Sequence, residues 1–182
     1  MNKIIAIVLA LGVAGCVTAA PHTTYHVDDP YQFLAYAASR GSVPVMVVGD
    51  PYPGRRAEVE QAAVTAFQNN FPSFGKAFQT AAPAAGEGTK VVLVFASRPP
   101  FAPTACADPT RSAAAGAPGA GMMVSAVYCG VGPYSDYWMS FPAPASPDSP
   151  DFRQKLAQLA HHAVPRDINP DRRNSGTGAI PN

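Results

Sequence analysis

Apolar residues recur at the three-to-four-residue spacing of an amphipathic helix in three stretches of the chain. The first stretch opens with Asp29 as N-cap, has a proline in its first turn, places Phe33 on its apolar face and ends at Gly41. The second covers residues 55–70, and the third begins with Ser149 as N-cap and ends before Pro165. We therefore predict three helices, each burying one face, and a further short helical turn over residues 73–81.

Four other segments have the apolar patterns of strands. Residues 43–48 and 90–96 are almost continuously apolar, as in strands that are covered on both faces. Residues 122–129 and 136–141 are joined by a glycine-rich turn, which indicates a hairpin. A strand–helix–strand step crosses over right-handed and makes its two strands parallel. The order predicts an α+β fold, a two-layer sandwich with helices packed on a mixed sheet of about four strands.

The amino-terminal segment has the layout of an export signal. One lysine precedes an apolar run and small residues up to a cysteine, and the run is too short to cross a membrane, which takes about 20 residues. Val13-Ala14-Gly15-Cys16 resembles the lipobox of bacterial lipoproteins. The resemblance implies that residues 1–15 are a cleaved signal peptide, and that diacylglycerol and an amino-terminal acyl chain are attached to Cys16. The alternative is an ordinary secretory signal with a chance cysteine.

This resemblance also implies where the protein lies and how it is organised. Two acyl chains give stable anchoring, so the membrane is the first expected partner. Val17, in place of aspartate, implies the outer membrane facing the periplasm under enteric-type sorting. We expect a lipidated amino terminus and tether over 16–28, a single α+β domain over 29–164, and a disordered tail over 165–182. The rest of the chain resembles uncharacterised bacterial lipoproteins, and this resemblance implies no activity.

Composition narrows the classes of partner. Hydrophobic residues make up 47% of the 182 residues, enough for one domain with a core. Charged residues make up only 14%, and the formal net charge is +1. Because Lys3 lies in the predicted signal peptide, the mature chain is near neutral. It lacks the basic face that an electrostatic nucleic-acid binder needs, so we expect no nucleic-acid partner.

Two cysteines remain once Cys16 is set aside. An even number of cysteines in a chain with an export signal favours a disulfide, here between Cys106 and Cys129. It would close a loop that is rich in alanine, glycine and proline. The alternative is a reactive or metal-binding pair, which the absence of CxxC spacing and of a nearby histidine disfavours.

The loop after the first predicted strand is a candidate binding site. Its spacing, from Gly49 to Arg56, is similar to that of a phosphate-binding loop, but its two prolines lack N–H donors and Asp50 would repel phosphate. Arg55 and Arg56 begin a helix, where an anion or a lipid headgroup could bind; the alternative is a solvated helix start. Tyr52 completes this part of the candidate surface.

The hairpin supplies the other part of the candidate binding surface. Aromatic residues bring a large contact area at low entropic cost, so they are common on recognition surfaces. The alternative is that they cover the sheet and the disulfide. The residues selected here are Tyr134, Asp136, Tyr137 and Trp138.

Catalytic and cofactor motifs are absent from the sequence. There is no GxSxG nucleophile motif, and His161 and His162 are adjacent, so their side chains diverge on a helix and do not share a metal. We therefore expect no metal and no cofactor. The leading hypothesis is a non-catalytic binding or assembly accessory domain for an envelope protein or cell-wall partner. The alternatives are an envelope hydrolase and a small-molecule or metal carrier.

Overall fold

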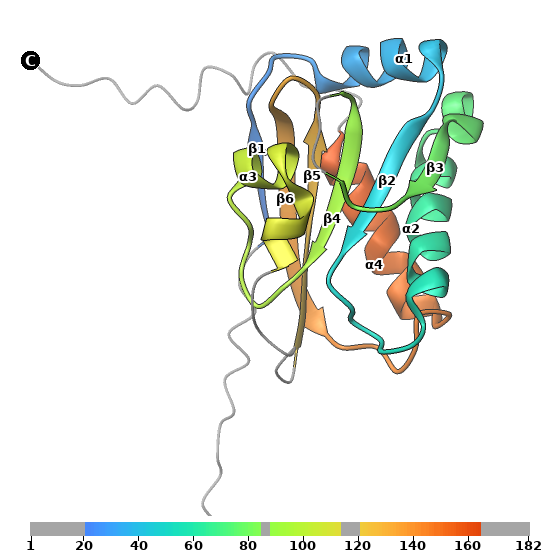
Figure 1. The fold of residues 1–182 in the computed structure, drawn as a ribbon. Coiled ribbons are helices and arrows are strands. Elements are labelled where there is room, and N and C mark those ends of the chain that lie inside the picture. The colour runs from blue at the N-terminus through green and yellow to red at the C-terminus, as the bar shows by residue number, and fades with distance from the viewer. Residues whose placement is uncertain (1–20, 85–87, 114–120, 165–182) are drawn as a thin grey trace, which may run out of the picture.

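The computed structural model describes residues 21–84, 88–113 and 121–164 (Figure 1). The predicted signal peptide, Cys16 and the tail over 165–182 lie outside these ranges. The described chain is α+β with a mixed sheet, as the sequence predicts.

The sheet has six strands where the sequence predicts about four. In spatial order they run β1-β6-β5-β4-β2-β3. Strands β2, β3 and β4 are mutually parallel where they pair, whereas the other neighbours are antiparallel. Their bounds are β1 His22–Tyr25, β2 Val43–Val48, β3 Phe78–Ala81, β4 Lys90–Phe95, β5 Gly121–Cys129 and β6 Pro133–Pro142.

The two strands that the sequence analysis missed are the two edge strands. Strand β1 (HTTY) falls in the predicted tether, and β3 (FQTA) falls where a helical turn was predicted over 73–81. Each has four residues, too few to show an alternation, and an edge strand needs less apolar surface than a central one. The tether prediction is therefore wrong over β1, whose four residues pair with β6.

The three long helices lie where the sequence predicts them. They are α1 Pro30–Arg40, α2 Arg56–Asn70 and α4 Pro150–Ala163; the shorter ones are η1 Pro72–Ala77, α3 Ala102–Ala107 and η2 Pro109–Ala113. The Asp29 carboxylate accepts from the backbone N–H of Gln32 at 3.1 Å, and the Ser149 hydroxyl accepts from that of Phe152 at 3.2 Å. Both predicted N-caps are thus confirmed.

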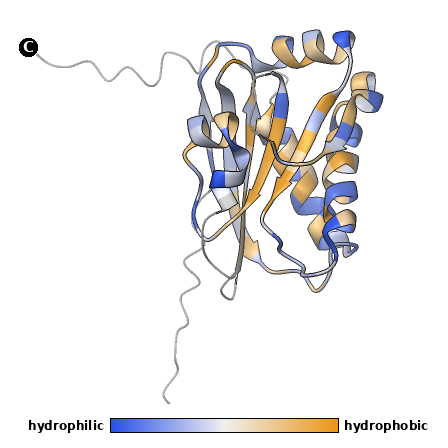
Figure 2. Ribbon diagram, in the orientation of Figure 1, coloured by the Kyte–Doolittle hydropathy of each residue, from blue (hydrophilic) through white to orange (hydrophobic). Residues whose placement is uncertain are grey.

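Helices cover both faces of the sheet, whereas the predicted two-layer sandwich has helices on one face only. The larger core joins the sheet to α2 and α4, with Leu34 of α1 closing one end. The smaller core lies between α3 and the opposite face of β2, β4 and β5. Figure 2 shows that β2 and β4, which lie between the two cores, are the most hydrophobic strands.

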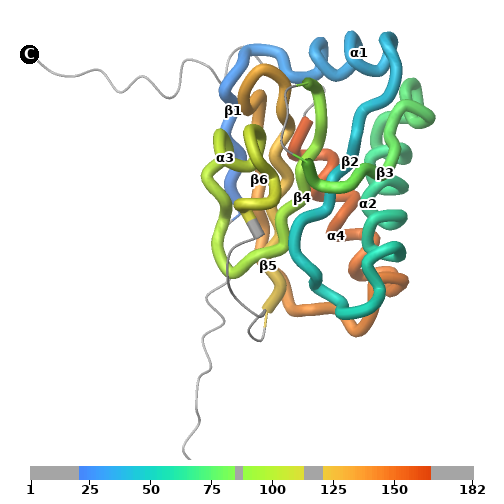
Figure 3. Tube along the Cα trace, in the orientation of Figure 1, coloured from blue at the N-terminus to red at the C-terminus, as the bar shows by residue number. Residues whose placement is uncertain are grey.

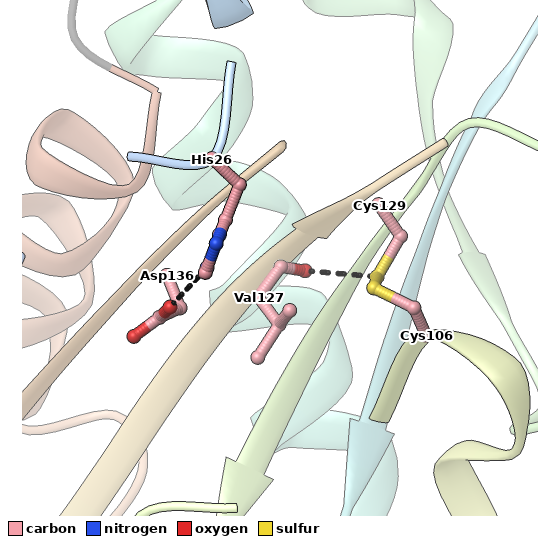
Figure 4. The surroundings of a disulfide bond; sticks show 5 residues. All are labelled: His26, Cys106, Val127, Cys129 and Asp136. Atoms are coloured by element: carbon pink, nitrogen blue, oxygen red, sulfur yellow. Dashed lines mark hydrogen bonds and ion pairs between the residues drawn. A yellow bond between two sulfur atoms is a disulfide. The ribbon is translucent and has the colours of Figure 1, made fainter. Parts of the chain in front are cut away.

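The predicted disulfide is present and joins the smaller core to the sheet. Cys106 of α3 and Cys129 of β5 are bonded with a Cα–Cα distance of 5.5 Å, and both are buried (Figure 4). The Cys129 sulfur lies 3.8 Å from the Val127 carbonyl oxygen. This is a packing contact, because the sulfur of a disulfide carries no hydrogen. The bond fixes α3 on the face opposite α2 and α4.

Candidate functional site

The two parts of the surface selected from the sequence lie at opposite ends of the sheet. The loop from Asp50 to Arg56 follows the carboxyl end of β2. The β5–β6 turn follows Cys129, which pairs with Lys90 at the amino end of β4, and β4 is parallel to β2. The eight residues therefore do not form one binding surface, although each part remains a separate candidate.

In the loop, the selected polar groups are engaged within the domain. The Arg55 guanidinium donates to Asp148 at 2.8 Å and also to Glu58, while Arg56 donates to Glu60 at 2.7 Å. The hydrogen bond from Arg55 holds the pKa of Asp148 below its usual value. The contact with Asp148 joins the start of α2 to the segment before α4, whereas the contacts with Glu58 and Glu60 lie within the first turns of α2.

The other loop residues differ in exposure. The Tyr52 hydroxyl donates to the Pro144 carbonyl at 2.9 Å, and its ring meets Phe152 edge-on at 5.3 Å. Arg56 also donates to the Val47 carbonyl at 2.6 Å. Asp50 is exposed. Tyr52 thus packs within the domain, and Asp50, a single exposed carboxylate, does not form a binding site by itself.

Along β6, the selected residues divide between the two faces. Tyr137 is buried against α4 and stacks on His162, with ring centroids 4.7 Å apart. Burial raises the pKa of the Tyr137 phenol and, together with the His161 charge, lowers the pKa of His162. Trp138 is half-buried on the opposite face, because successive side chains of a strand alternate.

Asp136 forms a hydrogen bond with a histidine that the sequence analysis placed in the tether. His26 Nε2 lies 2.8 Å from Asp136 Oδ2 (Figure 4). A hydrolase would need a nucleophile beside such a pair. Within the described ranges, no serine, threonine or cysteine hydrogen-bonds to this ring, and no group of three metal-ligating side chains is present. The pair ties the end of β1 to β6.

Tyr134 is the one selected hairpin residue that reaches an exposed aromatic surface. Tyr128 pairs with Ser135 and Cys129 with Pro133, so Tyr134 is the extra residue of a β-bulge, a device that redirects a side chain. Its ring stacks on Phe33 of α1 with centroids 4.5 Å apart. In Figure 1, α1 lies across the end of the sheet at which this hairpin turns.

Other exposed apolar side chains belong to the same segments, α1 and the β5–β6 turn, and to the end of β1. Phe33 is 43% exposed, although its spacing suggested a buried position, and Tyr36 lies one helical turn further on α1. The backbone N–H of His26 donates to the Tyr134 carbonyl, so Tyr25, the residue before His26, lies close to the hairpin. We call this surface the aromatic patch; it consists of Tyr25, Phe33, Tyr36, Val131 and Tyr134, with Tyr36 66% and Val131 93% exposed.

Gly130 makes room for the Tyr134 ring. A Cβ at this position would lie 2.1 Å from the ring, whereas one at Gly132 would meet nothing within 4 Å. We expect Gly130→Ala to lower the free energy of unfolding by about 1–3 kcal/mol, because overpacking forces the ring to shift. Urea denaturation measures the change.

The matched control for this change is Gly132→Ala, expected to stay within about 0.5 kcal/mol of the wild type. Adding Tyr134→Ala to Gly130→Ala removes the clash, so the two substitutions should be less than additive. Full additivity would contradict this packing.

Comparisons with known proteins assign this chain to no family. No family model and no curated protein matches this chain. A solved structure, a dodecamer of a PelC point variant from Paraburkholderia phytofirmans, is similar over 80% of this chain and 93% of that chain. The identity is 8% and the TM-score 0.41, so this likeness carries no argument.

Proposed function

We propose that this protein is a lipid-anchored envelope lipoprotein whose domain binds an envelope protein without catalysing a reaction. The observation that carries the binding role is the partly exposed stack of Phe33 on Tyr134 within the aromatic patch. Large aromatic side chains dominate the energy of protein interfaces, and monomeric domains rarely leave such groups clustered in water.

The form of the aromatic patch favours a protein partner over a small molecule. Small-molecule sites are concave and enclose most of the ligand. Here Val131 projects from the hairpin turn with 93% of its surface exposed, and Tyr36 projects from α1. A projecting apolar patch fits a groove or a flat face on another protein.

The Cys106–Cys129 bond supports placement outside the cytoplasm, because structural disulfides persist in oxidising compartments. The described ranges include no helix with the length and hydropathy to cross a bilayer. The anchor that we propose is instead the lipid on Cys16. His22, the first residue of β1, lies six residues further along the chain, so the greatest possible reach of the chain between them is about 20 Å. The location that we propose is the outer membrane, with the domain facing the periplasm.

Site-specific photo-crosslinking in the native envelope tests the binding role. A benzophenone amino acid at Tyr36 should give one discrete crosslinked species that mass spectrometry identifies. We expect Phe33→Ser or Tyr134→Ser to reduce its yield at least about tenfold, because interface aromatics commonly contribute 2 kcal/mol or more.

The control is Phe101→Ser, which removes a more exposed aromatic residue ahead of α3, on the other face of the sheet. It should leave the crosslink intact. The binding role is wrong if the patch variants crosslink as the wild type does. It is also wrong if no species forms while the purified domain turns over an envelope substrate.

A further inference from the structure

A pocket of about 340 Å³ lies between the segment after β4 and the α3–η2 unit. Figure 3 shows the chain leaving β4 and running to α3, away from α2 and α4. Arg98 from the connecting segment and Arg111 from η2 both line this pocket. It is therefore distinct from the aromatic patch and from the loop after β2.

The described part of the chain supplies no counter-charge to these two guanidinium groups. Among the residues that the structure describes, neither Arg98 nor Arg111 has an ion-pair partner, in contrast with Arg55 and Arg56. The acid nearest in sequence, Asp108, accepts hydrogen bonds from the backbone and hydroxyl of Thr110. Two unpaired cations lining one pocket favour the binding of an anion there.

The pocket also has hydroxyl groups. Ser112 lines it and is only 9% exposed, and its buried hydroxyl has no hydrogen-bond partner in the structure. Buried polar groups are rarely left without a partner, so this hydroxyl is available to hydrogen-bond a bound ligand. Thr104 of α3 adds a half-buried side chain to the same wall.

This combination matches the chemistry of a phosphate group. Arginine's planar fork binds phosphate oxygens in pairs, and two such forks can share the oxygens of one phosphate. The hydroxyls of Ser112 and Thr104 can donate to the oxygens that remain. The Phe101 ring, 73% exposed at the pocket, supplies an apolar surface for the organic part of a phosphoester.

We propose that this pocket binds the phosphate group of a phosphoester, through Arg98 and Arg111 with the two hydroxyls. The phosphate can belong to a soluble molecule or to the headgroup of an anionic phospholipid. The site does not depend on the proposed protein partner, so Phe33→Ser should leave it unchanged.

Titration calorimetry on the purified mature chain, with glycerol 3-phosphate as the probe, tests the site. We expect binding that weakens at least tenfold in Arg98→Gln/Arg111→Gln. Arg40→Gln, which removes an exposed cation at the end of α1, is the control and should bind as the wild type does. Unchanged circular dichroism and melting temperature show that the double variant is folded.

Vesicle flotation separates the two sources of phosphate, using unlipidated Cys16→Ser protein. Binding to phosphatidylglycerol vesicles, but not to phosphatidylcholine vesicles, that the double variant loses supports the headgroup. Binding of glycerol 3-phosphate without vesicle binding supports a soluble phosphoester. The proposal is overturned if neither probe binds, or if the double variant binds both as the wild type does.

Discussion

Replacing Cys16 with serine is expected to move the protein entirely from the detergent phase to the aqueous phase. Serine has no thiol to accept diacylglycerol, so the proposed acyl chains are lost together. Each buried methylene of an acyl chain contributes about 0.8 kcal/mol to membrane binding, and a single chain already anchors only marginally. Detergent phase separation measures the change, and intact mass spectrometry measures the attached lipid.

Cys106→Ala is the control for this experiment, because it removes a cysteine elsewhere in the chain and should leave the detergent partition unchanged. Two results would contradict the anchor: a Cys16→Ser protein that remains in the detergent phase, or a wild-type chain without acyl mass. Either would also remove the reason for placing the domain at a membrane, while leaving the aromatic patch and the arginine-lined pocket to be tested separately.

Removing the disulfide as Cys106→Ala/Cys129→Ala is expected to lower the free energy of unfolding by about 3 kcal/mol. The cysteines are 23 residues apart, and a loop of this size restricts the unfolded chain by about that amount in the chain-entropy model. Urea denaturation under oxidising conditions measures the difference between the double variant and the wild type.

The wild type in reducing buffer provides the matched comparison and should approach the stability of the double variant. A double variant within about 0.5 kcal/mol of the oxidised wild type would contradict the expected contribution of the bond. The same experiment bears on the pocket, because the bond holds α3, and with it Thr104, against β5. Weaker glycerol 3-phosphate binding in the double variant is the expected result.

Much of the fold could be predicted because its signals are local. The Asp29 and Ser149 caps are confirmed by their hydrogen bonds, and β2 and β4 lie within their apolar runs. The disulfide followed from an even cysteine count and was confirmed by the structure. The edge strands β1 and β3 were missed because four residues that pair along one side have little pattern of their own.

The candidate sites could be predicted only in part, because they depend on which segments meet. Tyr137 and Trp138 are neighbours in sequence, yet one is buried against α4 and the other lies on the opposite face. Phe33 has the spacing of a core residue, but it is exposed and stacks on Tyr134, which belongs to a distant part of the chain. No local pattern contains that contact.

By itself the sequence determined the long helices, the central strands, the pairing of the cysteines and the resemblance to a lipobox. Each of these follows from residues close in the chain or from a count of one residue type. The tertiary structure alone decided that a bulge directs Tyr134 to α1, and that Arg98 and Arg111 share a pocket with a buried hydroxyl. The physical reason is that exposure and unpaired charge are properties of the folded surface, which forms only when distant segments pack together.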